Sequence, residues 1–283
     1  MVAYPFVEDV SIADPDDPRV ADYRGLGDSE LMRARGVFVA EGRMVVQRLL
    51  EDGQYAIRSL LVSPAARLAL DAVLSQREIA ARVPSIYFAP TEAFEAITGF
   101  NFHRGCLALA GRPGERTLES VVDGASLLVL LEGVTDPDNV GGVFRNAAAF
   151  GVEAVLLSPT CCDPLYRKAI RTSMGATFRV PFARIPDWPA ALAGLGRAGV
   201  AIVALTPRQP SISLDEFVAT RGPGRVALVV GTEGPGLTPE VEAIADQRVC
   251  IPMRSDVDSL NLAVATGIAL SRIAGLTRLR VLT

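Results

Sequence analysis

The stretch that decides the fold runs from Asp138 to Gly151, reads DNVGGVFRNAAAFG, and follows the apolar run SLLVLLEGV (126–134). Its apolar residues have the i, i+3, i+4, i+7, i+8 spacing of a buried helix face: Val140, Val143, Phe144, Ala147 and Ala148. A buried strand followed by an amphipathic helix is the repeating unit of α/β sheets. We therefore predict one such strand–helix unit here.

Arg145 is the unusual residue of this helix. At about 100° per residue it points about 140° away from the middle of the apolar stripe, so we expect it on the outward side. One interpretation is a capped surface helix with a solvated arginine. The other is a ligand crevice at the carboxyl end of the preceding strand.

The second half of the chain repeats this strand–helix alternation. The expected strands are residues 126–134, 152–159, 179–185, 201–207, 225–231 and 247–253. The expected helices are residues 138–151, 166–176, 188–199, 213–220, 238–245 and 260–276. The strands are unbroken apolar runs, which is typical of parallel strands buried on both faces. We predict an open parallel sheet over residues 118–283, with ligands at the carboxyl ends of its strands.

The first half predicts a smaller α/β domain over residues 28–112. Its helices are expected at 41–53, 64–80 and 91–98, and its strands at 57–63, 85–90 and 105–111. The segment 111–117, GRPGERT, is the best candidate for a linker. Residues 1–27 show no periodicity, and residues 1–30 carry eight acidic side chains against two arginines. We expect residues 1–27 to form a flexible extension.

Composition narrows the classes of protein. The 283 residues are 49% hydrophobic and 21% charged, which is typical of a soluble protein that can form hydrophobic cores. No apolar run is long enough for a membrane span, and the first residues lack a secretory signal, so we expect a cytoplasmic protein. The cysteines show no CxxC or disulfide-dense pattern, and we expect no metal: Cys106, Cys161, Cys162 and Cys250.

Two further loops at strand ends are unusual. GTEGPGLTPE (231–240) has glycines that let backbone groups approach a flat ligand, but neither a phosphate-loop ending nor G-x-G-x-x-G spacing. Its segment 238–240 is an ordinary helix start. In IPMRSDVDSLNLAVA (251–265), Asp258 or Ser259 as a simple helix cap is as good an explanation as a binding site.

Taken together, the three segments resemble the SpoU/TrmH family of RNA ribose methyltransferases, within the knotted SPOUT superfamily. The family's motifs, N-x-G-x-x-x-R, apolar-G-x-E-G-x-G and I-P-M…S-L-N, occur here in the family's order. The matching residues are Asn139, Gly141, Arg145, Gly231, Glu233, Gly234, Gly236, Ile251, Pro252, Met253, Ser259, Leu260 and Asn261. Two residues depart from the pattern: Ser255 replaces a usual glycine and Asn146 a common threonine.

The resemblance implies methyl transfer from S-adenosylmethionine to a ribose 2′-hydroxyl of tRNA or rRNA. It also implies a deep trefoil knot, a homodimer formed through the C-terminal domain, and an N-terminal substrate-binding domain similar to a ribosomal protein. The implied catalytic residues are Asn139, Arg145, Glu233, Ser259 and Asn261. The implied cofactor-binding residues are Leu205, Gly231, Gly236, Ile251, Met253 and Leu260. The candidates for RNA contact are His103, Arg104, Arg167, Lys168 and Arg171, although the last three also suit a solvated helix face.

The role of Arg145 stays open between two mechanisms. The family is thought to use this arginine as a base. A guanidinium has a pKa above 12, however, and therefore keeps its proton at neutral pH. Physical chemistry therefore favours electrostatic stabilisation of the emerging alkoxide, with Glu233 as a candidate partner for the guanidinium.

Two other classes of protein remain. One is a catalytically inactive RNA-binding or ribosome-assembly protein on the same fold. The other is a nicotinamide-dependent oxidoreductase, which the missing glycine fingerprint disfavours.

Overall fold

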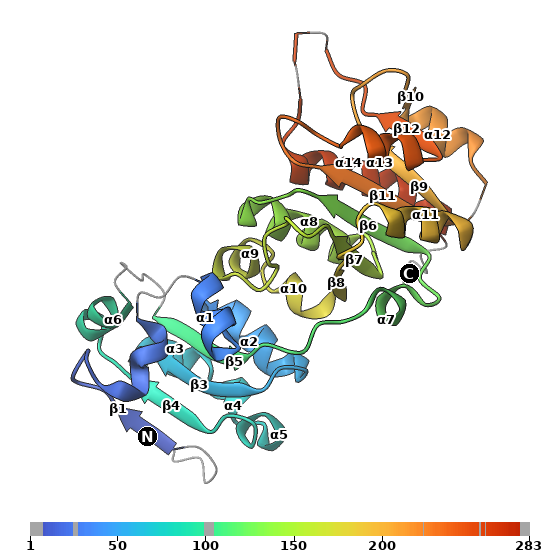
Figure 1. The fold of residues 1–283 in the computed structure, drawn as a ribbon. Helices are drawn as coiled ribbons and strands as arrows, with labels where there is room; N and C mark the ends of the chain where they lie inside the picture. Colours follow the sequence, from blue (N-terminus) through green and yellow to red (C-terminus); the bar gives the residue numbers. More distant parts are fainter. Residues whose placement is uncertain are drawn as a thin grey trace. The chain divides into compact units, whose positions relative to one another are not determined.

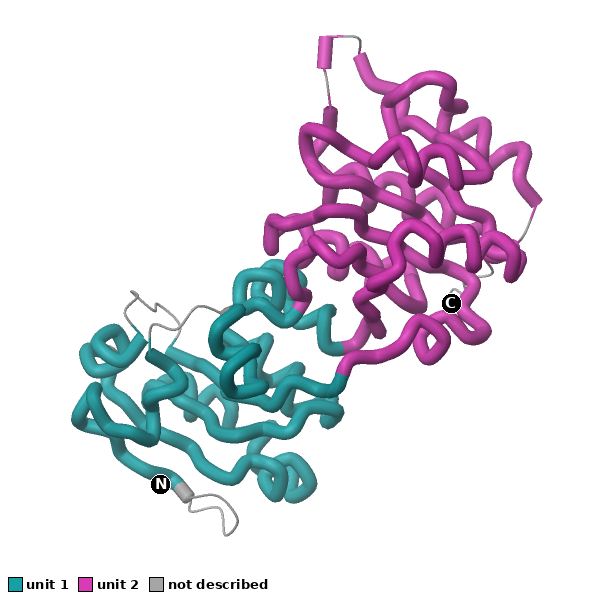
Figure 2. Tube along the Cα trace, in the orientation of Figure 1, with its two compact units in different colours: residues 1–114, 165–178 teal, residues 115–164, 179–283 magenta. Residues whose placement is uncertain are grey.

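The computed structural model describes residues 8–24, 28–98, 105–222, 224–254, 256–257 and 259–277. The chain divides into two compact units (Figure 2). Unit 1 contains residues 1–114 and 165–178, and unit 2 contains residues 115–164 and 179–283. The boundary after Gly114 lies in the predicted linker, but the separate segment 165–178 differs from the two continuous domains that we expected.

Unit 2 alternates strands and helices, as the sequence predicts (Figure 1). Its strands are β6 (Leu127–Glu132), β7 (Ala154–Leu157), β8 (Phe182–Arg184), β9 (Val200–Leu205), β10 (Ile212–Ser213), β11 (Arg225–Gly231) and β12 (Gln247–Cys250). Its helices are α7 (Leu118–Val122), α8 (Pro137–Ala149), α11 (Ala190–Arg197), α12 (Leu214–Thr220), α13 (Pro239–Ile244), α14 (Leu262–Ile273) and the 3-10 helix η2 (Ala274–Thr277). Strand β10 is too short to have been visible in the sequence pattern.

The seven strands form one parallel sheet in the order β10-β12-β9-β11-β6-β7-β8. Apolar residues of α7, α11 and α13 pack on one face of this sheet. Helices α8, α12 and α14 pack together on the other face, where α14 contacts both α8 and β11. The strand interiors are almost fully buried, as expected for parallel strands covered on both faces.

Helix α8 confirms most of the predicted amphipathic pattern. Val140, Val143, Phe144 and Ala147 are fully buried, and Arg145 is exposed. Ala148, which we expected on the buried face, is exposed near the end of the helix.

Unit 1 has a mixed five-stranded sheet in the order β1-β4-β3-β5-β2. Its strands are β1 (Glu8–Ser11), β2 (Val37–Glu41), β3 (Ile57–Val62), β4 (Ser85–Phe88) and β5 (Cys106–Gly111). Its helices are η1 (Pro18–Tyr23), α1 (Asp28–Arg35), α2 (Arg43–Asp52), α3 (Pro64–Ala69), α4 (Asp71–Leu74), α5 (Arg77–Ala80), α6 (Thr91–Thr98) and α9 (Arg167–Thr172), and α10 (Ala176–Arg179) begins in it. The β1–β4 and β3–β4 pairs are parallel, whereas β5 runs antiparallel to both β2 and β3.

The prediction of a flexible extension over residues 1–27 is wrong for residues 8–24. Strand β1 pairs with β4, while Ile12, Val20 and Tyr23 are buried in the core of unit 1. The hydroxyl of Tyr23 donates to the carbonyl oxygen of Ser59 at 2.9 Å. These few apolar residues anchor a leader whose overall composition is acidic.

The single helix expected over residues 64–80 is three short helices, α3, α4 and α5. The break before α5 lies at Gln76, whose backbone is extended. Beside it, Ser75 Oγ donates to the carbonyl oxygen of Asp71 at 2.7 Å. Such side-chain bonds to the backbone compete with continuation of a helix.

The segment 165–178 joins unit 1 through its own packing. Phe178 contacts the rings of Phe38 and Tyr55, at centroid distances of 6.1 and 5.3 Å. Arg171 forms an ion pair with Glu41 at 3.1 Å.

Among the described residues, no helix combines the length and the apolar character that a membrane crossing requires.

Candidate active site

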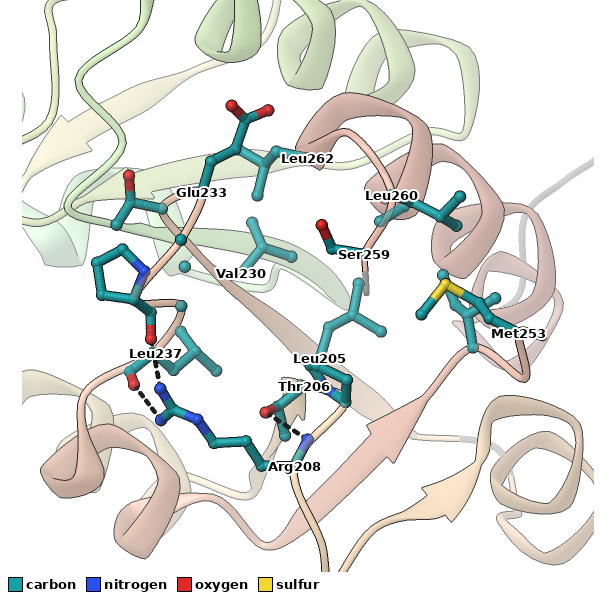
Figure 3. A pocket seen from close by; sticks show the side chains of 18 residues that line it. Leu205, Thr206, Arg208, Val230, Glu233, Leu237, Met253, Ser259, Leu260 and Leu262 are labelled. Atoms are coloured by element: carbon teal, nitrogen blue, oxygen red, sulfur yellow. Dashed lines mark hydrogen bonds between the residues drawn. The ribbon is translucent and has the colours of Figure 1, made fainter. Parts of the chain in front are cut away.

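Two of the three loops that the sequence singled out, those after β11 and β12, line a pocket at the carboxyl ends of β9, β11 and β12 (Figure 3). These three strands are neighbours in the sheet, so the segments that follow them converge at one edge. All six residues that we expected to bind a cofactor line this pocket: Leu205, Gly231, Gly236, Ile251, Met253 and Leu260. Glu233 and Ser259 line it as well.

Gly231 is required by the close return of the chain after β11. A Cβ atom added there would lie 2.3 Å from the carbonyl carbon of Gly236 and 2.5 Å from the nitrogen of Leu237. The amide of Gly236 donates to the carbonyl oxygen of Thr232 at 3.1 Å and closes the turn. Gly234 and Gly236 have φ angles of +83° and +70°, which other residues adopt only with strain. The glycines therefore shape a wall of exposed backbone.

Asn261 joins the three motif loops at the edge of the pocket. Its Nδ2 donates to Asn139 Oδ1 at 2.9 Å and to Glu233 Oε1 at 3.1 Å. Its Oδ1 accepts from the backbone amides of Ala263 and Val264 and caps α14. The helix cap is therefore Asn261, not Ser259, and Asp258 lies outside the described residues.

This geometry fixes which groups remain for a ligand. Because Oδ1 of Asn261 caps the helix, its amide group must face the other two side chains as a donor. Glu233 accepts through one oxygen, so its second oxygen stays available, as does the amide nitrogen of Asn139. The network presents both a donor and an anionic acceptor.

The crossing of α8 and α14 brings Asn139 and Asn261 together. A Cβ atom at Gly142 would lie 2.5 Å from the Cβ of Ala263, and one at Gly267 would lie 3.0 Å from Asn146 Nδ2. Asn146 Nδ2 donates to the carbonyl oxygen of Ala263 at 2.6 Å. Asn146, noted as a departure from the family pattern, thus helps to hold the two helices.

Arg145 does not join this network within the chain. It is exposed, and it forms no hydrogen bond or ion pair with any residue that the structure describes. Arg145 lies six residues after Asn139, which corresponds to about 9 Å along the helix and about 120° around it. The candidate pairing of Arg145 with Glu233 is not observed within the chain, where the carboxylate of Glu233 contacts Asn261.

Comparison with known proteins identifies the family. The model of the SpoU rRNA Methylase family matches residues 126–271. The chain is 41% identical over 264 residues to an uncharacterized tRNA/rRNA methyltransferase of Mycobacterium tuberculosis, covering 91% of this chain and 89% of that protein. The chain belongs to the SpoU methylase family.

Solved SpoU-type structures agree with the fold. The AdoMet-bound rRNA methyltransferase of Sinorhizobium meliloti superposes with a TM-score of 0.75 at 26% identity, covering 94% of this chain and 97% of that one. The SpoU methyltransferase AviRb of Streptomyces viridochromogenes has a TM-score of 0.76 at 21% identity, covering 92% and 98% of the two chains. This chain thus has the α/β fold with a parallel sheet of SpoU methyltransferases.

Sequence reasoning missed the polar residues that support the SpoU pocket from outside the three motifs. Glu132 is buried at the end of β6, where it accepts from Trp188 Nε1 at 3.0 Å and from the amide of Thr238 at 2.9 Å. Arg208 follows β9 and contacts the glycine turn. A charged residue at the carboxyl end of a buried strand was the available signal for both.

The candidates for RNA contact have different outcomes. Arg167, Lys168 and Arg171 lie on α9, and Arg171 is paired with Glu41. His103 and Arg104 lie outside the described residues, as does Ser255.

The four cysteines are free thiols. Burial raises the pKa of the Cys162 thiol to about 12, with the neighbouring Cys161 as a second cause. In the described part of the chain, no cluster of three His, Cys, Asp or Glu side chains is arranged to hold a metal ion.

Proposed function

We propose that this chain transfers a methyl group from S-adenosylmethionine to a ribose 2′-hydroxyl of tRNA or rRNA. The observation that carries the proposal is the meeting of a glycine-walled pocket with the hydrogen-bonded Asn139, Glu233 and Asn261. We also propose a cytoplasmic location, where such RNA substrates occur.

The residues present suit an S-adenosyl group. Apolar side chains of Leu205, Ile251 and Leu260 line the pocket beside the exposed backbone of the glycine turn. Apolar walls with main-chain donors and acceptors are typical of sites for flat heterocycles. Bound there, the sulfonium group supplies an electrophilic methyl group. In this proposal, the cofactor is held by six residues of the pocket: Leu205, Gly231, Gly236, Ile251, Met253 and Leu260.

The chain's own task is to align the hydroxyl and to manage its proton. A ribose hydroxyl is a weak nucleophile, and fixed alignment with the methyl–sulfur bond alone lowers such barriers by several kcal/mol. The free oxygen of Glu233 and the amide of Asn139 are available to orient the ribose, with Ser259 on the pocket wall. The free carboxylate oxygen of Glu233 would accept the proton of the hydroxyl, and Arg145 would electrostatically stabilise the negative charge that develops on the ribose oxygen.

We propose that Arg145 reaches the pocket from a second copy of the chain. Within one chain it points away from Asn139, so a site that uses it needs another protomer. Helix α14 exposes Val264 and Ile268, one turn apart, with 52% and 37% of their surface accessible. An exposed apolar face on this helix suits a self-complementary contact in a homodimer.

Two further parts of the proposal concern the fold and the RNA. The segments after β11 and β12 would form the deep trefoil knot of the SPOUT superfamily. Unit 1 would act as a substrate-binding domain similar to a ribosomal protein. Its candidates for RNA contact are His103, Arg104, Arg167, Lys168 and Arg171.

Two measurements test the activity. Calorimetry with S-adenosylmethionine distinguishes a methyltransferase from an inactive RNA-binding relative, which would not bind the cofactor. Mapping of 2′-O-methyl groups in total RNA, with and without the gene, should reveal a lost modification and identify the target. An unchanged methylation map would reject the proposed activity.

The role of Arg145 has its own test. Arg145→Ala should abolish turnover and leave cofactor affinity near normal, because the side chain acts on the hydroxyl. Near-normal turnover with intact cofactor binding would reject this role.

A further inference from the structure

A set of polar contacts supports the glycine turn from below, around the guanidinium of Arg208 (Figure 3). Arg208 Nη1 donates to the carbonyl oxygen of Leu237 at 2.9 Å, and Nη2 donates to the carbonyl oxygen of Pro235. A guanidinium presents its donors in a rigid fork, so one side chain orients two carbonyl groups at once. Both carbonyls belong to the turn that forms one wall of the pocket.

The peptide group between Leu237 and Thr238 is held at both ends. Its carbonyl oxygen accepts from Arg208, and its amide donates to Glu132 Oε2 at 2.9 Å. One contact comes from a cation after β9, and the other from an anion at the end of β6. This peptide plane therefore has little freedom to rotate.

The peptide group between Pro235 and Gly236 is held in the same way. Its carbonyl oxygen accepts from Arg208, and its amide donates to the carbonyl oxygen of Thr232. A turn with several glycines has many backbone conformations available, so ordering it costs more entropy than ordering other residues. External contacts such as these offset that cost.

Arg208 is itself oriented by a buried carboxylate. The side chain of Glu242 is 9% exposed, and its Oε1 accepts from Thr206 Oγ1 at 3.0 Å and from Arg208 Nη1 at 3.4 Å. The amide of Arg208 donates to Thr206 Oγ1 at 3.2 Å. Arg248 lies 3.7 Å from the other oxygen of Glu242. The guanidinium is therefore held in place, although 47% of the Arg208 side chain is exposed.

We propose that Arg208 is a positioning residue that sets the shape of the glycine turn and thereby the affinity of the pocket for S-adenosylmethionine. It acts through the carbonyl groups of Pro235 and Leu237. The inference rests on the proposed function for its ligand, and on the contacts of the turn alone for its mechanism.

The experiment compares Arg208→Met and Arg208→Lys in the full chain with a matched control, Arg225→Met. Arg225 also donates to backbone carbonyls, those of Ala125, Ala198 and Val122, but at the opposite end of β11. Two quantities are measured at a temperature where all variants are folded. One is calorimetric affinity for S-adenosylmethionine, and the other is amide hydrogen exchange of residues 232–237 without ligand.

We expect Arg208→Met to weaken cofactor binding about tenfold, comparable to one lost charge-assisted hydrogen bond. Arg208→Lys should weaken it less, because a lysine keeps the charge but loses the fork. Exchange in residues 232–237 should accelerate in both variants. Arg225→Met should lower the melting temperature and leave affinity and local exchange unchanged.

The outcomes separate the two proposals. If the unmodified protein does not bind S-adenosylmethionine, the proposed function fails, and hydrogen exchange still decides the role of Arg208. If Arg208→Met binds the cofactor like the unmodified protein and exchanges no faster in the turn, the positioning role is overturned. Equal effects of Arg208→Met and Arg225→Met on affinity would also overturn it, since they would indicate general destabilisation. Should Arg208→Met not fold, Arg208→Lys decides by the same two readouts.

Discussion

The crossing of α8 and α14 can be tested with two opposite substitutions, Gly142→Ala and Ala263→Gly, which add a side-chain methyl group on one helix and remove one from the other. A Cβ at Gly142 would lie 2.5 Å from the Cβ of Ala263, whereas carbon atoms in favourable contact are about 3.5–4.0 Å apart. Gly142→Ala alone therefore forces the helices apart by about 1 Å or more, at an overpacking cost of about 1–3 kcal/mol. Ala263→Gly removes the opposing methyl group. The double variant should regain the packing, and its opposed changes in helix propensity, each about 1 kcal/mol, should largely cancel.

The assay is urea unfolding of the unmodified protein, both single variants and the double variant. We expect the double variant to be more stable than the sum of the single changes predicts, by about 1–3 kcal/mol. The matched control pairs Ala263→Gly with Gly194→Ala on α11, where an added Cβ meets only a distant arginine side chain at 3.9 Å. The control pair should be additive within about 0.5 kcal/mol. Equal additivity in the α8–α14 pair would refute the described crossing.

Three further predictions follow from the glycine turn, the N-terminal segment and the half-buried thiol of Cys162. Gly231→Ala should weaken the binding of S-adenosylmethionine at least tenfold by calorimetry, because the added Cβ meets backbone at 2.3 Å, whereas Gly194→Ala should leave it unchanged. Tyr23→Phe should lower the free energy of unfolding by about 1–2 kcal/mol, because it removes the buried hydroxyl that bonds to Ser59. Cys162 should alkylate at pH 8 about 10³-fold more slowly in the native protein than after unfolding, because its raised pKa leaves little thiolate, and the native rate should rise with pH towards about 12.

Each of these three predictions has an outcome that contradicts it. A Gly231→Ala protein with unchanged cofactor affinity would mean that the turn does not return as closely as described. Unchanged stability of Tyr23→Phe would mean that the buried hydrogen bonds between Tyr23 and Ser59 contribute little to the stability of unit 1. Rapid labelling of Cys162, measured by mass spectrometry at pH 8, would contradict the raised pKa of its thiol.

Local patterns in the sequence were sufficient to predict much of unit 2. The spacing of Val140, Val143, Phe144 and Ala147 indicates one face of α8, and unbroken apolar runs indicate the strands. The motif glycines also indicate the wall of the pocket, because few other residues tolerate such close backbone approach. These signals each lie within a short stretch of chain.

Contacts between distant residues were not predictable in the same way. Arg208 and Glu242 are 34 residues apart, and nothing in either stretch indicates that they meet. In the acidic leader, Val10 and Ile12 are too few to reveal a strand, although tertiary packing is enough to order it. Arg145 shows a related limit, since the sequence predicts its outward direction but not what it faces.

The packing of residues 165–178 in unit 1 has a consequence for protein engineering. Because the chain leaves unit 2 at residue 165 and returns to it at residue 179, no single cut of the chain separates the two units. A truncated protein that starts at residue 115 would retain Phe178 but lose Phe38 and Tyr55, the rings against which it packs. A chimera that exchanges unit 1 between relatives must therefore transplant two separate pieces of chain, or it will expose this aromatic side chain.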